Sequence, residues 1–301
     1  MTTPPLLDGT LPGGSPGAEV RVHPLVCGTA KAFPQYYERP RGRFGMQRAL
    51  AEGLVTPRSR WVTMPLPAFL VEHPTAGPFM IDTGVSASHA SDGGRGDLGR
   101  VGGAILGATM TPQMAAGAQV RALGHDPEQL PLVVMTHLHF DHLGGSDQFP
   151  GAEFLVAKSE WSDPPSSTKG TYGHHRDAVR RWRLLDDTAS AGEPHDRLSR
   201  TWDLFGDGSV LLAWTPGHTP GHLSVVLRLR GGRPALLTAD AAYARRTIDE
   251  RLVPMLCPDV PTYLRSLDEL RAYVAHTPDA LVLAGHDAER WETDSAAIAN
   301  A

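Results

Sequence analysis

The chain has 301 residues, of which 41% are hydrophobic and 20% are charged, a balance that supports a large folded core and excludes a disordered chain. Its formal net charge is -5 at pH 7, so nucleic acids and anionic membranes are poor candidates as partners. Two cysteines, Cys27 and Cys257, are too few for a disulfide framework, and no apolar run approaches the roughly 18 residues of a membrane span.

The N-terminal segment, residues 1–18, is rich in proline and glycine, and we expect it to form a flexible lead-in. It lacks the basic start and the apolar stretch of a signal peptide. Together with the scarcity of cysteines, this favours a soluble cytoplasmic protein.

The remaining residues, 19–301, are expected to fold as a single domain whose elements follow from hydrophobic periodicity. The expected strands are 19–27, 61–71, 78–81, 130–135, 153–156, 210–214, 223–229, 234–238 and 280–283, and the expected helices are 111–123 and 263–275. Residues 28–60 are interpreted as an irregular excursion, with a homodimer contact at 35–60 as a hypothesis, and residues 159–207 as a polar, partly helical insert. This order favours an α/β fold of two mixed β-sheets stacked face to face.

The strongest chemical signal, His137-Leu-His139-Phe-Asp141-His142, directly follows the apolar strand at 130–135. In an extended segment residues i and i+2 point the same way, so His137 and His139 can bind one metal from one face. A helical turn after Phe140 would bring the next two side chains toward a second metal. Imidazole and carboxylate ligands suit zinc, iron, manganese or cobalt. A chance cluster of surface histidines explains this spacing poorly.

Three further candidates follow later strands: His218 in the loop Thr-Pro-Gly-His-Thr-Pro-Gly-His, then Asp240, then His286. Alone, Asp240 is better explained as a turn or cap aspartate and His286 as an ordinary histidine. All of them fall at the carboxyl ends of expected strands, however, which favours one shared site. A carboxylate such as Asp240 can bridge two metals, whereas His222, which begins the next strand, is interpreted as a structural neighbour.

Together these motifs resemble those of the metallo-β-lactamase superfamily over residues 19–287. The resemblance implies an αββα four-layer sandwich, with two mixed β-sheets flanked by helices and a two-metal site along one edge. It also implies that Asp82 supports the site by orienting a ligand histidine. The implied cofactors are two divalent metal ions, with zinc as the first choice and iron, manganese or cobalt as alternatives. The implied ligands are His137, His139 and His218 for one metal, Asp141, His142 and His286 for the other, and Asp240 for both.

Within that superfamily the chain is most similar to the N-acyl-homoserine-lactone lactonases. Residues 136–145 read Thr-His-Leu-His-Phe-Asp-His-Leu-Gly-Gly, close to the motif of that family, and residues 110–127 resemble the helix before it. Tyr243 stands three residues after Asp240, where the family carries a tyrosine that assists the reaction. Glyoxalase-II-type thioesterases, exported β-lactamases, flavin-linked diiron proteins and the nuclease branch fit less well, because their added domains, export signals or glutamate in place of His139 are not visible.

The resemblance implies a quorum-quenching reaction in which a metal-bridging hydroxide, held beside Asp240, attacks the carbonyl carbon of a small lactone. Tyr243 would hydrogen-bond the developing oxyanion, and Asp141 would relay a proton to the leaving alkoxide. The alternative is a broader ester, aryl-ester, organophosphate or thioester hydrolase, because one fold hosts many chemistries. A metal-binding sensor without catalysis and a redox diiron protein are weaker hypotheses.

An acyl chain on the substrate requires an apolar groove. Phe44, Met46, Phe69 and residues 159–207 are candidates for lining it, although each is more often plain core. His174 and His175 lie in a polar, helix-like stretch and are expected to face solvent.

Overall fold

A computed structural model of the chain describes residues 3–91, 108–163, 169–188 and 191–301. Its described strands form two sheets, ordered β4-β1-β2-β3-β5-β6-β7 and β13-β12-β11-β10-β9-β8. The strands of the first sheet are β1 (Arg21–Ala32), β2 (Val62–His73), β3 (Gly77–Ile81), β4 (Ala108–Thr109), β5 (Leu132–Val134), β6 (Glu153–Ala157) and β7 (Arg181–Leu185). Those of the second are β8 (Glu193–His195), β9 (Leu198–Asp203), β10 (Val210–Trp214), β11 (Leu223–Arg228), β12 (Pro234–Ala239) and β13 (Leu281–Ala284).

Both sheets are mixed, as the sequence predicts. In the first, β4, β1, β2 and β3 pair antiparallel, whereas β3, β5, β6 and β7 pair parallel. In the second, β12 and β13 pair parallel and the other neighbours pair antiparallel. Parallel neighbours end at the same edge of a sheet, so the loops that follow β3 and β5, and those that follow β12 and β13, come out side by side.

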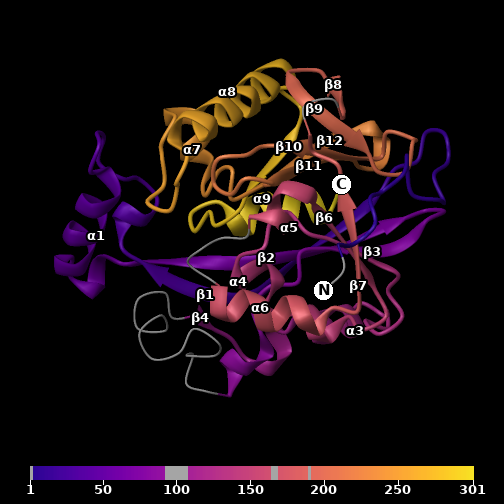
Figure 1. Cartoon of the computed structure of the whole chain (residues 1–301), viewed down its shortest axis with the longest axis horizontal. Helices are drawn as coiled ribbons and strands as arrows, with labels where there is room; N and C mark the ends of the chain where they lie inside the picture. Colours follow the sequence, from indigo (N-terminus) through magenta and orange to yellow (C-terminus); the bar gives the residue numbers. More distant parts are fainter. Residues whose placement is uncertain (1–2, 92–107, 164–168, 189–190) are drawn as a thin grey trace.

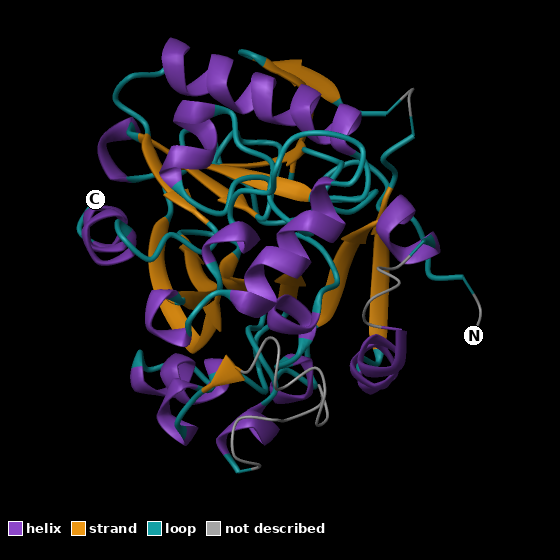
Figure 2. Cartoon of the chain, turned by 90° about the vertical axis from the view of Figure 1, so that its left-hand side faces the viewer, coloured by secondary structure: helices purple, strands orange, loops and turns teal. Residues whose placement is uncertain are grey.

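Helices cover the outer faces of the two sheets, which completes the predicted αββα sandwich (Figures 1 and 2). Figure 1 shows α7 and α8 above the second sheet, α3, α4 and α6 below the first, and α1 standing out from the body at the left. The α-helices are α1 (Gly45–Val55), α3 (Ala116–Ala122), α4 (Phe140–Leu143), α5 (Lys158–Ser162), α6 (Lys169–Ala178), α7 (Arg245–Glu250), α8 (Val260–His276) and α9 (Trp291–Ala299).

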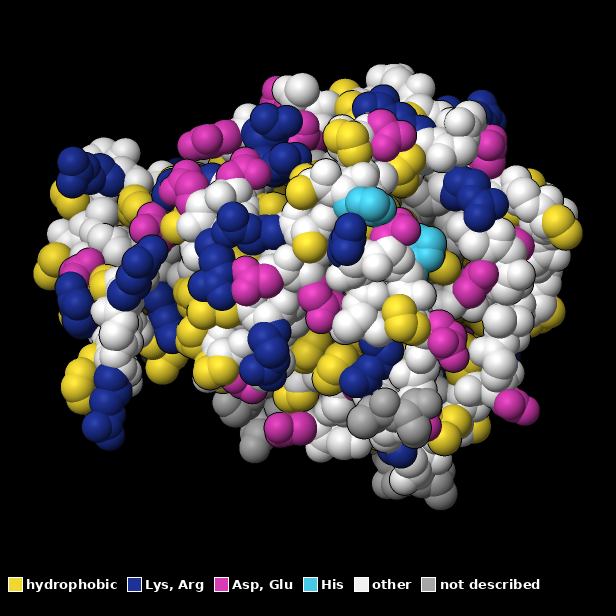
Figure 3. Space-filling model, turned by 90° about the horizontal axis from the view of Figure 1, so that it is seen from above, with side chains coloured by type: hydrophobic (Ala, Val, Ile, Leu, Met, Phe, Trp, Pro, Cys, Tyr) yellow, Lys and Arg dark blue, Asp and Glu magenta, His cyan; other side chains and the backbone are white. Residues whose placement is uncertain are grey.

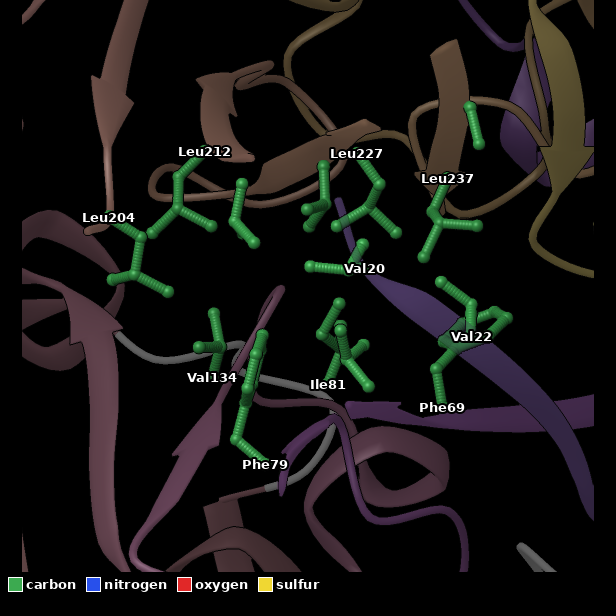
Figure 4. Close-up of a cluster of buried hydrophobic side chains, with 14 of the residues drawn as sticks. Val20, Val22, Phe69, Phe79, Ile81, Val134, Leu204, Leu212, Leu227 and Leu237 are labelled. Atoms are coloured by element: carbon green, nitrogen blue, oxygen red, sulfur yellow. The ribbon is translucent and has the colours of Figure 1, made fainter. Parts of the chain in front are cut away.

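Buried apolar side chains lie between the sheets and also on the outer face of each sheet, because each sheet is covered on both faces. Phe69 and Val71 on β2 belong to the cluster between the sheets, and Leu70 between them belongs to the cluster under α3. On β10, Leu212 joins the central cluster and Leu211 joins the cluster under α8. Figure 4 shows the central side chains pointing toward one another from both sheets. This alternation is the physical reason that the strands are nearly continuous apolar runs.

The structure corrects the expectation of a flexible lead-in. The amide of Leu7 donates a hydrogen bond to the carbonyl of Leu184 at 2.7 Å, and the amide of Leu11 donates one to the carbonyl of Leu204 at the same distance. The segment therefore pairs with β7 and with the end of β9. Leu7 and Leu11 also pack against the central core, which offsets the conformational entropy of a proline- and glycine-rich segment.

Residues 159–207 are partly helical, as expected, but they are not an insert, because they supply β7 at the edge of the first sheet and β8 and β9 at the edge of the second. The excursion at 28–60 contains the end of β1 and the helix α1. After the last strand the tail forms α9, whose Trp291 and Ile298 enter the central core. These elements were not predicted from the sequence. Edge strands and a terminal helix bury only part of their surface, so their hydrophobic pattern is weak.

The helix expected at 111–123 begins later than the sequence suggests. Residues Pro112–Met114 form a separate 3-10 turn, and Ala115 adopts an extended conformation before α3 starts at Ala116. The Thr111 side chain makes no capping hydrogen bond. The helix expected at 263–275, in contrast, is present as α8, with the apolar residues Leu267 and Leu270 buried.

Basic and acidic side chains are interspersed over the face that Figure 3 shows from above. Among the residues that the structure describes, no helix combines the length and the apolar character needed to cross a membrane.

Candidate metal centre

Four loops at one edge of the sandwich bring the predicted ligands together. The His-x-His-x-Asp-His segment follows β5, and the loop of His218 joins β10 to β11. Asp240 follows β12 directly, and His286 comes two residues after the end of β13. The donor atoms form two groups, and within each group all of them lie within 4.8 Å of one another. The groups are His137, His139, His218 and Asp240, and Asp141, His142 and His286.

In the first group three imidazole rings converge on one point. Nδ1 of His139 lies 2.9 Å from Nε2 of His137 and 2.9 Å from Nε2 of His218. Burial lowers the pKa of His137 and His139 well below the usual histidine range, and the neighbouring imidazoles lower it further. These rings are therefore neutral at physiological pH, and their lone pairs are available to a cation.

In the second group two imidazoles face one carboxylate. Oδ2 of Asp141 lies 3.6 Å from Nε2 of His286 and 4.0 Å from Nε2 of His142. Burial lowers the pKa of His142, but the nearby carboxylates outweigh burial and raise the pKa well above its usual value. The excess of negative charge around His142 is the electrostatic setting in which a cation is stabilised.

Asp240 lies between the two groups and presents one oxygen to each. Its Oδ2 is 3.0 Å from Nε2 of His218, whereas its Oδ1 is 3.1 Å from Nε2 of His286 and 3.3 Å from Nε2 of His142. Burial raises the pKa of Asp240, but the surrounding imidazoles outweigh burial and hold it well below the usual value. The arrangement matches the bridging position that the sequence suggested.

Asp82 lies behind the candidate ligands, at the position that the resemblance to the superfamily implies. Its Oδ1 accepts a hydrogen bond from the Thr136 amide at 2.8 Å, and its Oδ2 accepts one from the Thr136 hydroxyl at 2.7 Å. The same Oδ2 lies 2.7 Å from Nδ1 of His142, so Nε2 of that ring is turned toward the centre. Asp82 has a φ of 57°, a left-handed conformation that costs a non-glycine residue energy and recurs at functional sites.

Backbone carbonyl groups orient two other rings. Nδ1 of His218 donates to the carbonyl of Leu256 at 3.0 Å, and Nδ1 of His286 donates to the carbonyl of Pro65 at 2.9 Å. Such bonds fix the tautomer and leave Nε2 for a metal. Gly217, just before His218, has a φ of 123° and lies against the backbone of Tyr263. A side chain at Gly217 would clash with that backbone.

His222 lies beside the centre as a structural neighbour, as expected. Its Nε2 accepts a hydrogen bond from the Asp240 amide at 3.0 Å, and its Nδ1 lies 2.9 Å from the Thr215 hydroxyl. With both nitrogens occupied, His222 positions the backbone of Asp240 and is outside both groups of donors.

The donor set fits two divalent cations. Nε2 of His142 and Oδ1 of Asp240 are buried only 3.3 Å apart, yet neither makes a hydrogen bond of good geometry within the described part of the chain. Unpartnered buried polar atoms are costly, and a cation between them would remove that cost. Imidazole and carboxylate donors in two adjacent groups are the chemistry of a dinuclear centre.

Tyr243 stands at the edge of both groups. Its ring centroid lies 5.3 Å from that of His286 and 5.8 Å from that of His218. Its hydroxyl is buried, interacts with the side chain of Tyr36, and makes no hydrogen bond to a candidate ligand among the described residues. Burial raises the pKa of Tyr243 well above its usual value, and the nearby Tyr36 and Asp240 add to the effect. The hydroxyl therefore keeps its proton and can donate it to a hydrogen bond.

The sequence analysis did not identify two residues beside the centre. Tyr36 stacks on Tyr243, and Glu160 contacts two ligand loops. Burial raises the pKa of Glu160 to about 7, although hydrogen bonds from Thr219 and from two backbone amides oppose the shift. A weak signal for Glu160 existed, because it follows a buried strand as Asp82 does, but its partners lie far away in the chain.

An apolar cavity of about 260 Å³ opens beside Tyr36. It is lined by Ala32, Phe33, Tyr36, Met46, Gln47, Leu50, Met255 and Leu256. Of the three residues expected to line an apolar groove, Met46 lines this cavity and Phe44 is exposed to solvent. The expectation for Phe69 is wrong, because Phe69 packs in the central core against Trp291. His174 faces solvent as expected, whereas His175 is buried, which corrects that expectation.

Residues 65–286 match the sequence model of the metallo-beta-lactamase superfamily. The N-acyl homoserine lactonase AttM of Agrobacterium fabrum is 35% identical over 234 residues, which cover 76% of this chain and 84% of that protein. The N-acyl homoserine lactonase AiiA of Bacillus thuringiensis subsp. kurstaki is 27% identical over 258 residues, covering 84% of this chain and 93% of that protein. A crystal structure of a B. thuringiensis AiiA mutant with N-decanoyl-L-homoserine bound at the active site has the same fold, with a TM-score of 0.70 and 20% identity over 92% of this chain and 96% of that one.

Proposed function

The chain belongs to the metallo-β-lactamase superfamily, and from this premise we propose that it opens the ring of N-acyl-homoserine lactones. It is a metal-dependent hydrolase of that superfamily, with a dinuclear cluster of histidines and aspartates. The relatives named as N-acyl homoserine lactonases support the choice of lactones.

One observation carries the proposal: the buried, protonated hydroxyl of Tyr243 lies beside both donor groups and makes no hydrogen bond to any of the candidate ligands. In the free protein this hydroxyl interacts with the side chain of Tyr36. A substrate whose carbonyl oxygen gains negative charge in the transition state would be a stronger acceptor than a neutral hydroxyl, so the donor acts where the reaction needs it. Attack on an acyl carbon has this property, and a lactone is an acyl ester closed into a ring.

The carboxylates have separate tasks in the proposed reaction. Asp240 would hold the two halves of the centre together, since each of its oxygens faces a different group. Asp141 would accept a proton from the attacking water and return it to the leaving alkoxide, which yields a ring-opened hydroxy acid. Two divalent cations bound at such a centre, with zinc as the first choice, lower the pKa of water and polarise a carbonyl oxygen.

The apolar cavity beside Tyr36 supports an acylated substrate. The Tyr36 ring both lines the cavity and stacks on Tyr243, so the cavity begins next to the proposed oxyanion donor. The cavity also reaches Leu256, whose carbonyl holds His218. Only the Tyr36 ring would separate an acyl chain in the cavity from Tyr243. Each methylene buried there would contribute about 0.8 kcal/mol to the binding free energy.

A substrate panel tests the proposal against the broader ester hydrolase. The purified protein is incubated with short- and long-chain acyl-homoserine lactones, p-nitrophenyl esters and a β-lactam, with and without a chelator. We expect chelator-sensitive ring opening of the lactones at rates well above ester cleavage. Ester turnover equal to or faster than lactone opening would contradict the lactonase assignment and leave a hydrolase of wider specificity.

A further inference from the structure

Glu160, a second buried carboxylate, joins two of the loops that carry candidate ligands. It lies on α5, directly after β6, and its side chain is completely buried. Its Oε1 accepts a hydrogen bond from the amide of Leu138 at 3.0 Å, and its Oε2 accepts one from the amide of Gly221 at 3.1 Å. Leu138 lies inside the His-x-His segment and Gly221 lies in the loop of His218, so one carboxylate spans both loops.

The contact between α5 and the loop of His218 leaves no room for a side chain. A Cβ atom on Gly221 would lie 2.5 Å from the backbone nitrogen of Glu160 and 2.6 Å from its Cβ. The start of α5 is itself fixed, because the amide of Ser159 donates to Oδ1 of Asp187 at 3.0 Å and its hydroxyl donates to the same carboxylate. The backbone that carries Glu160 is therefore fixed by the bonds between Ser159 and Asp187.

His139 depends on this backbone contact more than the other ligand histidines do. Its Nδ1 faces His137 and His218, and no hydrogen bond within the described residues holds its other nitrogen. Its position must follow from the backbone on either side, and Glu160 binds that backbone at the neighbouring amide of Leu138. A ring without a partner of its own is placed by whatever fixes its main chain.

We propose that Glu160 is a positioning residue for the first donor group, in parallel with Asp82 for the second. By binding both loops, Glu160 sets the separation between the rings of His139 and His218. Asp82 instead holds Thr136 and His142. The inference rests on the dinuclear centre within the proposed function and is independent of which ester the enzyme hydrolyses.

Cobalt titration separates the two carboxylates. Apoprotein of the wild type, Glu160→Gln and Asp82→Asn is titrated with Co²⁺ against a competing chromophoric chelator, and the d–d absorption bands report the geometry of each site. A glutamine at this position places its NH₂ group, a donor, against one of the two backbone amides. The hydrogen bond to that amide is therefore lost. We expect Glu160→Gln to weaken one of the two binding events by roughly 10- to 100-fold and to change its bands, and Asp82→Asn to weaken the other.

Gly221→Ala tests the same contact from the opposite side, since its methyl group pushes the loop away from α5 and leaves the Glu160 carboxylate unchanged. We expect it to weaken the same event as Glu160→Gln, and it decides the question if Glu160→Gln fails to fold. Glu153→Gln is the matched control, because Glu153 lies on β6 and pairs with Arg183 at 2.8 Å, away from the ligand loops. We expect wild-type Co²⁺ binding from this control.

The inference is overturned if Glu160→Gln and Gly221→Ala bind both Co²⁺ ions with wild-type affinity and spectrum, or if they weaken both events equally. A wild-type protein that binds no Co²⁺ would remove the dinuclear centre together with the inference. A wild-type protein that binds two Co²⁺ ions but opens no lactone would contradict the proposed substrate and leave the role of Glu160 intact.

Discussion

The ring of Tyr36 stacks on the ring of Tyr243, with centroids 5.3 Å apart and an angle of 24° between the planes. Tyr37 packs edge-on against the same ring at 6.1 Å, and its hydroxyl donates a hydrogen bond to the carbonyl of His286 at 2.8 Å. The Tyr243 ring is therefore held between two aromatic neighbours and the donor groups. Its hydroxyl needs little reorganisation to meet a charge that develops in the reaction.

Replacing Tyr243 with phenylalanine should slow lactone opening without disturbing the metals. The loss of one hydrogen-bond donor to the oxyanion predicts a decrease in kcat of roughly 10²- to 10³-fold. Metal content should stay at the wild-type level, because the hydroxyl that is removed makes no hydrogen bond to a candidate ligand among the described residues. Steady-state kinetics and metal analysis of the same preparation measure both quantities.

Tyr263→Phe is the matched control for Tyr243→Phe. Tyr263 is another fully buried tyrosine, but it lies on α8 and belongs to the cluster under that helix. We expect wild-type kinetics from this variant. Equal losses of activity in the two variants would contradict a specific role for Tyr243.

Removing the metals should destabilise the protein as well as inactivate it. Without cations the converging donors of His137, His139 and His218 lose the charge that holds them together. A ligand that binds only the folded state contributes about 4 kcal/mol to stability at a thousandfold excess over its Kd. Thermal unfolding with and without a chelator should therefore show a lower Tm after chelation that Zn²⁺ restores, and an unchanged Tm would contradict the metal centre.

Acid should remove a contribution to stability that comes from Asp207, far from the active site. Its Oδ2 accepts a hydrogen bond from the Ser15 amide at 2.8 Å and lies 3.0 Å from Nε2 of His73. Burial raises the pKa of Asp207, but hydrogen bonds from Ser209, Ser15 and His73 outweigh burial and lower the pKa to about 2. The folded state therefore favours the ionised carboxylate, a contribution that is complete above pH 4 and is lost as the pH falls toward 2.

The Asp207→Asn variant should accordingly be less stable by about 2 kcal/mol at neutral pH, and the difference from the wild type should shrink as the pH is lowered from about 4. Urea unfolding across this pH range measures the change. Asp126→Asn is the control, because Asp126 lies in an exposed turn, and we expect an effect within about 0.5 kcal/mol. A difference for Asp207→Asn that stays constant with pH would contradict the assignment.

The homodimer contact at 35–60 stays a prediction of the sequence, and α1 offers a surface for it. Five large apolar side chains on and beside this helix are exposed: Phe44, Met46, Leu50, Leu54 and Val55. Exposed apolar side chains that gather in one place commonly mark an interaction surface. We expect light scattering to give a dimer for the wild type and a monomer for the double variant Leu54→Glu, Val55→Glu, while Gln47→Glu on the same helix should remain dimeric. A monomeric wild type would show the hypothesis to be wrong.

The donor set could be predicted because each ligand stands immediately after a strong local pattern. The apolar run at 130–135 and the spacing of His137, His139 and His142 need no tertiary information. Asp240 and His286 are ordinary residues in isolation, but their common place after expected strands was sufficient to join them to the site. The order of the same strands favoured two mixed β-sheets, and the resemblance to the superfamily implied the four-layer sandwich.

The remaining features depend on contacts between distant segments, which local patterns do not encode. Glu160 meets backbone amides of two loops far from it in the chain, and an amide carries no signature in the sequence. Tyr36 matters through its stacking on a ring more than two hundred residues away. In β7, Trp182 and Leu184 are buried, whereas Arg181 is exposed and Arg183 is partly exposed, a two-residue alternation that the polar character of 159–207 obscured.

The most direct measurement is anomalous diffraction from crystals of the zinc-loaded protein, collected on either side of the zinc absorption edge. The account predicts two peaks for each chain, one among His137, His139 and His218 and the other among Asp141, His142 and His286, with Asp240 between them. A single peak, or zinc bound elsewhere with these side chains turned apart, would contradict the dinuclear centre on which the proposed reaction depends.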